Sequence, residues 1–234
     1  MKLYNDYMVN YLDVVFNPFY ILRSSLLIQI KSNAKNLHGK ILDFGCGSKP
    51  YKSCFLFDEY VGLDLYSPTN SNENLADFYY DGIVLPFEDG HFDSFFSSEV
   101  FEHVFNLENI LIEIRRVLKK DANCLITVPF NFELHEIPFD YARYTPYGLT
   151  YLLEKSGFQV TKIIPTTSNF SSLLQQALAY LYLHLIPTRF LKLVLAPIYI
   201  LPLNFIHLIF VLFKIPKLGS QTNPCNFVVI MKKL

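Results

Sequence analysis

A turn with glycines at alternate positions follows a short apolar run near the start of the chain. Asp43 opens this turn, and Gly45 and Gly47 flank Cys46 within it. Glycine lets the backbone approach a ligand closely, where a Cβ atom would collide. Asp64 follows Gly47 by 17 residues at the end of a second apolar run, where a carboxylate can accept hydrogen bonds from both hydroxyls of a ribose. The spacing indicates a nucleotide-like ligand, although Asp43 as a turn former and Asp64 as a strand-end cap are simpler interpretations.

A dinucleotide-binding loop would continue to a third glycine. Here Ser48, Lys49 and Pro50 follow the turn instead. This departure argues against a nicotinamide-dependent oxidoreductase, which is the competing class of enzyme.

Two further groups of residues could move a proton at such a site. Glu102 and His103 follow the fourth predicted strand. A loop after the fifth predicted strand combines imidazole, carboxylate, guanidinium and phenol groups in His135, Asp140, Arg143 and Tyr144. Such side chains act as general acids or bases when they lie within hydrogen-bond reach of a substrate. We expect His103, His135 and Tyr144 to be catalytic, and the four loop residues to bind the substrate. The alternative is that the loop tyrosines only pack.

A metal site is an alternative use of the same residues. Glu99, Glu102 and His103 have the spacing i, i+3, i+4, which would place them on one face of a helix. With His135 they would supply two carboxylates and two imidazoles to a divalent ion. We favour a site without a metal and keep this set as the alternative.

An alternation of strands and helices must bring these residues together. The predicted strands are 40–44, 60–65, 74–80, 91–98, 123–130, 158–164 and 227–232. A helix is expected at 108–119, and another at 145–156, capped by Thr145, with Pro146 at its first position and Gly157 after its end. This order predicts an α/β fold, a Rossmann-like, doubly wound, mostly parallel seven-stranded sheet with an apolar helical insertion before the last strand.

In this order, the glycine turn, Asp64 and the segments 81–87 and 92–103 resemble the class I S-adenosylmethionine-dependent methyltransferases, in particular methyltransferase domain 11. The resemblance covers about residues 38–160. It implies S-adenosyl-L-methionine as the cofactor. It also implies methyl transfer to oxygen or nitrogen of a small-molecule, glycan or lipid-linked acceptor. A cofactor-binding, membrane-docked module without catalysis is the non-enzymatic alternative.

The resemblance also implies roles for single residues. Asp43 and the turn from Gly45 to Gly47 correspond to the motif that holds the methionine portion of the cofactor. Asp64 corresponds to the acid that binds its ribose. The adenine amino group is expected to contact Asp81 and the Gly82 backbone, while Glu99 lies at the mouth of the site. The complete set of expected cofactor-binding residues is Asp43, Gly45, Gly47, Asp64, Asp81, Gly82 and Glu99.

Three parts of the chain are expected to fold differently. Residues 1–36 form an N-terminal helical cover, 37–164 with 223–234 form the cofactor-binding core, and 165–222 form the apolar insertion. The four cysteines are scattered without a metal-binding or disulfide pattern, which indicates a cytoplasmic protein.

The apolar insertion lies in a basic part of the chain. Glu154 is the last of 21 acidic residues, whereas eight of the 20 Lys and Arg residues follow it. We expect a helical hairpin, interrupted at Pro197 and Pro202, that enters and leaves on the same side. Residues 170–216 would lie peripherally on an anionic inner membrane face, or else form a lid or a homodimer surface. The net charge of −1 argues against nucleic acid as a partner.

Overall fold

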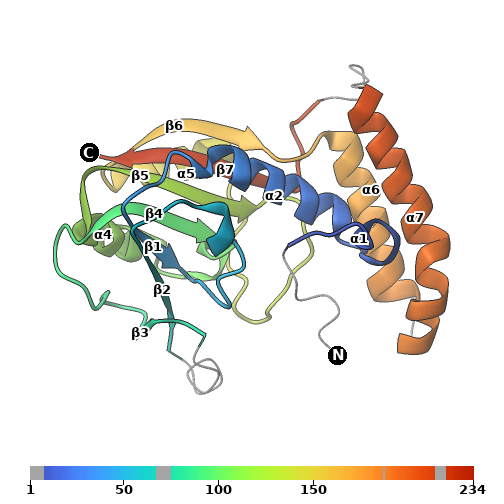
Figure 1. The fold of residues 1–234 in the computed structure, drawn as a ribbon, viewed down its shortest axis with the longest axis horizontal. Coiled ribbons are helices and arrows are strands. Elements are labelled where there is room, and N and C mark those ends of the chain that lie inside the picture. The colour runs from blue at the N-terminus through green and yellow to red at the C-terminus, as the bar shows by residue number, and fades with distance from the viewer. Residues whose placement is uncertain (1–7, 67–74, 187, 214–219) are drawn as a thin grey trace. The chain divides into compact units, whose positions relative to one another are not determined.

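Seven strands form one sheet in the computed structural model, which describes residues 8–66, 75–186, 188–213 and 220–234 (Figure 1). The strands are β1 Lys40–Phe44, β2 Glu59–Leu65, β3 Phe78–Tyr80, β4 Phe92–Ser98, β5 Leu118–Pro129, β6 Phe158–Pro165 and β7 Asn226–Lys233. Their order across the sheet is β3-β2-β1-β4-β5-β7-β6. The chain builds outward from β1 to one edge and then returns to β4 on the other side of β1. This arrangement confirms the predicted doubly wound fold.

The central strands run in parallel. β1 pairs with β2 and with β4, so that Asp43 lies opposite Gly62 on one side and Phe96 on the other. β2 also pairs in parallel with β3, and β4 with β5. Four of the five residues of β1 are buried, as in a sheet covered on both faces. The carboxyl ends of β1 to β5 therefore meet at one edge of the sheet, which we call the carboxyl edge, where open α/β sheets bind ligands.

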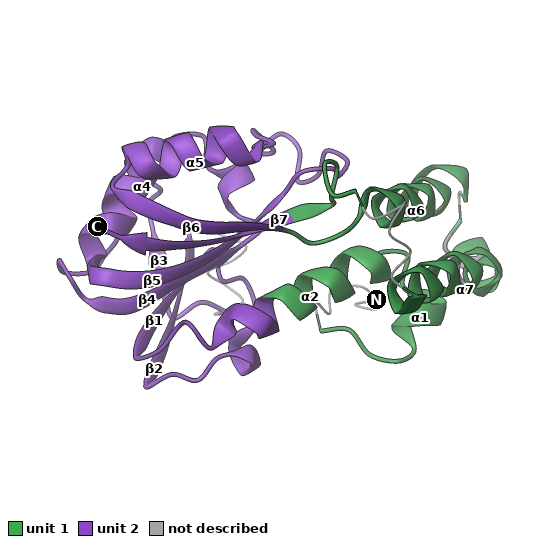
Figure 2. Ribbon diagram, turned by 90° about the horizontal axis from the view of Figure 1, so that it is seen from above, with its two compact units in different colours: residues 1–29, 165–226 green, residues 30–164, 227–234 purple. Residues whose placement is uncertain are grey.

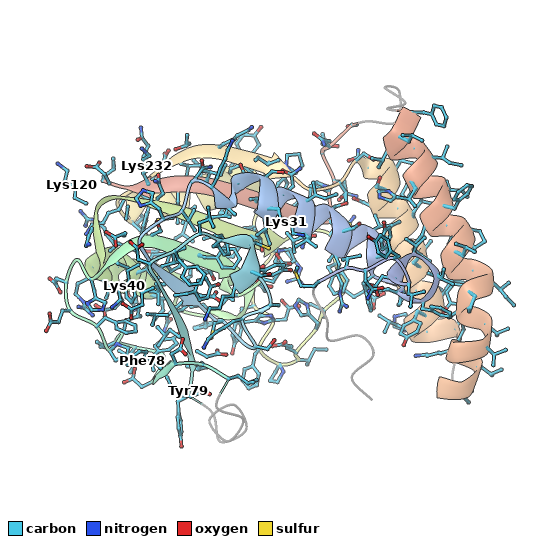
Figure 3. All side chains as sticks on the ribbon, in the orientation of Figure 1. Lys31, Lys40, Phe78, Tyr79, Lys120 and Lys232 are labelled. Atoms are coloured by element: carbon cyan, nitrogen blue, oxygen red, sulfur yellow. The ribbon has the colours of Figure 1, made fainter. Side chains whose placement is uncertain are left out.

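The last strand runs against its neighbours. Figure 1 shows β7 pointing opposite to β5 and β6. Lys120, near the start of β5, and Lys232, near the end of β7, lie at the same end of the sheet (Figure 3). The sheet is therefore mixed rather than wholly parallel.

The two ends of the segment between β6 and β7 lie next to each other. The backbone N–H of Thr166 donates to the carbonyl of Asn226 over 3.0 Å, and the Thr166 hydroxyl donates to the same oxygen over 3.1 Å. The insertion therefore begins and ends on the same side, as expected from the pairing of these two strands in one sheet.

Two helices, α4 Leu107–Val117 and α5 Pro146–Lys155, pack within the sheet unit. Their buried residues, Leu111 and Leu149 among them, belong to one apolar cluster with the strands. Thr145 caps α5, because its hydroxyl accepts from the backbone N–H of Gly148 over 3.2 Å. Gly157 follows the helix with φ +88°, a conformation that favours glycine. The sequence signals for both ends of α5 are thus confirmed.

Two compact units divide the chain (Figure 2). Residues 30–164 with 227–234 form the sheet unit, and residues 1–29 with 165–226 form the helical unit. The helical unit contains α1 Asp13–Phe16, the first part of α2 Tyr20–Ala34, α6 Asn169–Tyr180, a π-helical turn Leu181–Leu185 and α7 Arg189–Phe213. Its apolar centre is formed by Ile21, Leu178, Ala196 and Ile200.

The expectation that two prolines interrupt the long apolar helix is wrong. α7 continues through Pro197 and Pro202, although an interior proline costs about 3 kcal/mol. Ala196, Ile200 and Asn204 recur every four residues on its buried side. The Asn204 amide also donates to the carbonyl of Val14 in α1 over 2.9 Å. This packing continues on both sides of the prolines, and it offsets the lost backbone hydrogen bonds.

Candidate active site

The two glycines of the turn after β1 have different surroundings. Both have positive φ angles, +69° at Gly45 and +47° at Gly47. A Cβ atom at Gly45 would overlap the side chain of Val100, so this glycine is required by packing inside the protein. At Gly47 the same atom would meet nothing within 4 Å among the described residues. The backbone of Gly47 therefore faces open space, where a ligand can approach it.

Asp64 joins this turn to the end of β2. Its carboxylate accepts from the backbone N–H of Gly47 over 3.2 Å and from that of Leu65 over 2.8 Å. A carboxylate has about four lone-pair sites, so it can accept further bonds from the hydroxyls of a ligand. Burial raises the pKa of Asp64, and the two N–H groups act in the opposite direction.

Asp81 and Gly82 lie beside Asp64, because Leu65 pairs with Tyr80 in the β2–β3 register. One oxygen of Asp81 accepts from the backbone N–H groups of Ile83 and Val84, over 2.9 and 3.1 Å. These bonds lower the pKa of Asp81 and keep its exposed carboxylate ionised. The expected adenine-contacting pair is therefore next to the expected ribose-binding acid.

Asp43 is buried at the end of β1, where it faces a neighbouring strand. The hydroxyl of Tyr60 in β2 donates to its carboxylate over 2.7 Å. Burial raises the pKa of Asp43 to about 7, and the tyrosine hydrogen bond opposes this shift. Tyr60 was not identified from the sequence, because its link to Asp43 depends on the register of β1 against β2.

Glu99 follows β4 in a conformation that the sequence did not indicate. Its φ is +56°, and its carboxylate accepts from the hydroxyl of Thr127 in β5 over 2.7 Å. Glu102 and His103 lie instead in a separate 3-10 turn, Phe101–His103. The expectation that Glu99, Glu102 and His103 share one helical face is therefore wrong, because the chain bends at Glu99 before any helical turn begins.

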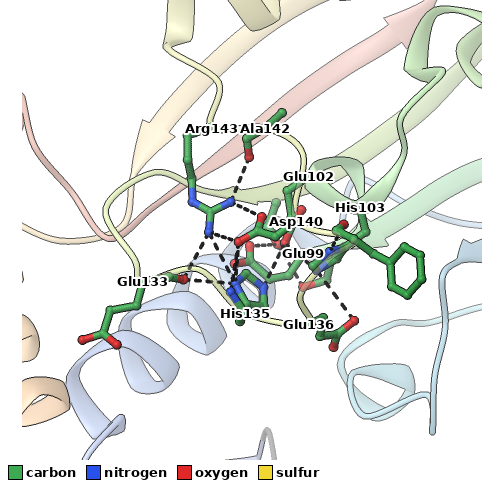
Figure 4. Close-up of polar contacts among 12 residues, drawn as sticks. Glu99, Glu102, His103, Glu133, His135, Glu136, Asp140, Ala142 and Arg143 are labelled. Atoms are coloured by element: carbon green, nitrogen blue, oxygen red, sulfur yellow. Dashed lines mark hydrogen bonds and ion pairs between the residues drawn. The ribbon is translucent and has the colours of Figure 1, made fainter. Parts of the chain in front are cut away.

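Glu102, His103 and His135 converge at the carboxyl edge (Figure 4). The Nε2 atoms of His103 and His135 lie 3.7 and 3.9 Å from Oε1 of Glu102. Glu102 is completely buried, with no hydrogen bond to either carboxylate oxygen from the described residues. Burial raises its pKa well above the usual range, and the negative charge of Glu99 adds to the shift. The structure thus brings together three of the four residues of the alternative metal set.

A partly buried ion pair holds the loop that carries His135. Both terminal nitrogens of Arg143 donate to the carboxylate of Asp140, whose side chain is only 2% exposed. Arg143 lowers the pKa of Asp140 to about 2. Two hydrogen bonds tie this loop to the 3-10 turn: the backbone N–H of Tyr141 donates to the Glu102 carbonyl over 2.8 Å, and Nδ1 of His103 lies 2.9 Å from the Phe139 carbonyl. Asp140 and Arg143 therefore hold the loop in place.

Tyr144 packs against the apolar core of the sheet unit. Burial raises its pKa, and the charge of Glu102 adds to this effect. Its phenol therefore stays protonated near neutral pH, where it can donate a hydrogen bond. Glu136, on the same loop as His135, lies close enough to raise the pKa of Asp64. The loop thus stands beside the expected ribose-binding acid.

These residues suit a cofactor that contains a ribose and an adenine. An open glycine backbone, a partly satisfied carboxylate and an exposed ionised carboxylate follow one another along the ends of β1, β2 and β3. The Glu102 and His135 groups follow β4 and β5 and face the same edge. The carboxyl edge therefore has two parts: the residues expected to bind a nucleoside, which we call the nucleoside-binding half, and a half that carries titratable groups.

Comparisons with known proteins agree with this geometry. Residues 42–126 match the family described as a methyltransferase domain. The chain is similar to a SAM-dependent methyltransferase from Archaeoglobus fulgidus, with 18% identity, a TM-score of 0.54, and 91% and 93% of the two chains covered. It is also similar to the cyclase SpnF, with 18% identity, a TM-score of 0.54, and coverage of 91% and 81%.

A third similar structure has its cofactor bound. Phosphoethanolamine N-methyltransferase 2 of Haemonchus contortus, in complex with S-adenosyl-L-methionine, shares 17% identity at a TM-score of 0.54, over 97% of this chain and 60% of that one. No curated protein matches this chain by sequence. The structural likenesses show the fold, and the match to the methyltransferase family spans the chain from β1 to β5.

Proposed function

Because the chain carries a class I S-adenosylmethionine-dependent methyltransferase domain, we propose that it methylates an oxygen or nitrogen of an acceptor bound at the loop of residues 133–145. The acceptor is a small molecule, a glycan or a lipid-linked compound. The observation that carries this proposal is the position of His103 and His135, which meet at the carboxyl edge, next to the nucleoside-binding half.

The bound cofactor supplies an activated methyl group on a sulfonium. The reaction then requires that the acceptor be aligned and that it lose a proton as it attacks. The cluster of Glu102, His103 and His135 is placed to take up that proton, and the Asp140–Arg143 pair positions it. Tyr144 can donate a hydrogen bond to the acceptor.

Exposed apolar side chains on the loop and just after the 3-10 turn form what we call the apolar rim, and they support an acceptor with an apolar portion. Leu134 and Ile137 on the loop are 70% and 73% exposed, and Phe139 is 58% exposed. Phe105, which packs edge-on against Tyr141, is 78% exposed. Large exposed apolar side chains that gather around polar groups mark binding sites for apolar ligands or surfaces. A lipid-linked acceptor fits this rim better than a fully hydrophilic one.

Activity on extracts tests this function. Full-length protein with a labelled methyl group on S-adenosylmethionine should transfer label to a compound in a membrane or lysate extract. His135→Ala should depress turnover but leave binding of S-adenosylhomocysteine nearly unchanged. His91→Ala is the matched control, because His91 stacks on Phe87 before β4 and is remote from the carboxyl edge. If His135→Ala abolishes cofactor binding while turnover per bound cofactor stays normal, the proposed role of the loop is wrong.

We further propose that the helical unit attaches the enzyme to an anionic inner membrane surface. Val194–Phe213 of α7 is long and apolar enough to cross a membrane, by length and composition among the described residues. Ile198, Phe205 and Leu212 are 68%, 58% and 75% exposed and recur every seven residues, so they lie near one face. The chain enters and leaves this segment at Thr166 and Asn226, which favours helices that lie in the membrane interface over a single crossing.

Vesicle sedimentation tests the attachment. The full chain should bind vesicles that contain anionic lipid, and high salt should release it only in part, because apolar burial adds to the charge attraction. Replacing Ile198, Phe205 and Leu212 together with serine should abolish binding. A matched triple change at Leu56, Ile83 and Ile112, which are 87%, 69% and 58% exposed in the sheet unit, should leave it intact. If the protein does not bind vesicles and sediments as a dimer, this face is a subunit interface instead.

A further inference from the structure

Glu102 is a buried carboxylate that accepts no hydrogen bond from the described residues, although imidazole nitrogens of His103 and His135 lie within 4 Å of it. It is 0% exposed, and neither Oε1 nor Oε2 has a hydrogen-bond partner among the described residues. Burying a carboxylate costs several kcal/mol unless it is paired or coordinates a metal. Nearby, both terminal nitrogens of Arg143 donate to Asp140, while its Nε atom has no hydrogen-bond partner among the described residues. The environment of Glu102 is therefore incomplete as it stands.

Two imidazoles face this carboxylate in the orientation of metal ligands. Nδ1 of His103 lies 2.9 Å from the Phe139 carbonyl, and Nδ1 of His135 lies 3.2 Å from the Glu133 carbonyl. A carbonyl oxygen can only accept, so the contact with Phe139 favours the tautomer of His103 that carries its proton on Nδ1 and keeps a lone pair on Nε2. Nδ1 of His135 also lies 3.3 Å from Nη2 of Arg143, which can only donate, so either ring nitrogen of His135 can carry the proton. Both Nε2 atoms are turned toward Glu102, at distances too long for a hydrogen bond. Histidines that bind metals are held by this kind of contact at their other nitrogen.

The spacing of the three groups also suits an ion. Their ligand atoms all lie within 4.8 Å of one another. Ligands bound at about 2.1 Å are separated by about 3.4 Å in a tetrahedral site and by about 4.2 Å on opposite sides of an ion. The groups therefore need to move by less than about 1 Å to share one ion. Glu99 is not among the three, and its Oε1 is bonded to Thr127.

We propose that Glu102, His103 and His135 bind one divalent transition-metal ion such as Zn²⁺ or Co²⁺. Two imidazoles and one carboxylate suit these ions better than Mg²⁺ or Ca²⁺, which prefer oxygen ligands. Three protein ligands leave coordination positions open, as in catalytic metal sites.

The open positions define the acceptor, a step that rests on the proposed methyltransferase function. An oxygen of the acceptor would bind the ion, which would lower the pKa of its hydroxyl. With the ion bound, the imidazoles are ligands rather than bases, so the proton goes to solvent instead of to the cluster. That oxygen forms a bond to the methyl carbon while the carbon–sulfur bond of the sulfonium breaks, and sulfur keeps the electron pair. The acceptor class is therefore a compound with a hydroxyl, or with neighbouring oxygens that chelate the ion, rather than an amine.

A Co²⁺ titration of the full-length protein tests the site without any acceptor. Visible absorption should show one ion bound per chain in a site with nitrogen ligands. Glu102→Gln and His135→Gln should each weaken binding by about 10-fold or more. Glu108→Gln, on α4, is the control, because Glu108 pairs with Lys155 at an exposed position. Thermal melting and S-adenosylhomocysteine binding verify that each variant is folded.

The outcomes separate this inference from the proposed function. If the protein binds no Co²⁺ or Zn²⁺, or if Glu102→Gln binds as tightly as Glu108→Gln, the metal site is overturned. If methyl transfer then continues at full rate after chelation, the proposed methyltransferase function is still supported. Conversely, if the protein binds Co²⁺ through these residues but methylates no compound, the metal site is supported and the proposed function is contradicted.

Discussion

Gly47→Ala should separate cofactor binding from stability. Alanine at a φ of +47° costs about 1 kcal/mol of folding free energy, because a left-handed conformation brings Cβ close to the following carbonyl oxygen. The added Cβ meets no atom of the described residues within 4 Å, so no steric overlap adds to this cost. The protein should fold, with its new methyl group standing where the ligand approaches the backbone.

The effect on the cofactor should be larger. A ligand packed against the Gly47 backbone would have to move away to reach the contact distance of about 3.5–4.0 Å from the new carbon. This displacement should weaken S-adenosylhomocysteine binding by at least about 10-fold, or about 1.4 kcal/mol. Calorimetry measures the binding, and denaturant titration measures the free energy of unfolding.

Two other glycines provide the controls. Gly90 has a φ of +64° and open space around its Cβ position, but it precedes β4 at the opposite edge of the sheet. Gly90→Ala should therefore lose the same stability and keep full binding. Gly45→Ala should lose more stability than either, because its Cβ would overlap Val100 as well. If Gly47→Ala binds S-adenosylhomocysteine as tightly as Gly90→Ala, the turn does not contact the cofactor and the reasoning fails.

Three further changes test other parts of the structure. Asp64→Ala should weaken S-adenosylhomocysteine binding by about 1.5–3 kcal/mol, the range for hydrogen bonds to a charged group, and calorimetry that finds no change would remove Asp64 from the site. The folded pKa of Asp43, about 7, exceeds its unfolded value. The folded protein therefore keeps a proton that the unfolded chain has released, and the free energy of unfolding should fall by at most about 4 kcal/mol as pH rises from about 4 to about 7. Asp43→Asn keeps the Tyr60 hydrogen bond and should flatten this dependence in denaturant titrations, whereas equal slopes in both proteins would contradict the burial argument. Thr145→Ala should cost about 1 kcal/mol of unfolding free energy through loss of the α5 cap, and a change near zero would show that the cap is redundant.

The apolar rim connects the proposal of an acceptor with an apolar portion to the proposal of an acceptor hydroxyl bound to a metal ion. Leu134 and Phe139 stand on the same loop that supplies His135 and the Phe139 carbonyl, which holds His103. An acceptor with an apolar portion and a hydroxyl would contact both the rim and the ion proposed for Glu102, His103 and His135. Such an acceptor also suits an enzyme whose helical unit lies on a membrane.

Local features of this protein followed from its sequence. The strands around the glycine turn, the cap of α5 at Thr145 and the order of Asp64 and Asp81 depend on neighbouring residues or on the regular alternation of strand and helix. Because parallel strands all end at the same edge, strand order alone also placed the candidate cofactor residues together. The sequence therefore determined the fold class and the nucleoside-binding half.

The titratable half was decided by the tertiary structure. The contact between Tyr60 and Asp43 depends on strand register, and the meeting of Glu102 with His135 depends on the path of a loop that is braced by Asp140 and Arg143. The same holds for α7, which continues through its prolines where local propensity predicted a break. All of these features depend on contacts between residues far apart in the chain, and such contacts have no periodic signal in the sequence. In α7 they also contribute more free energy than the prolines cost.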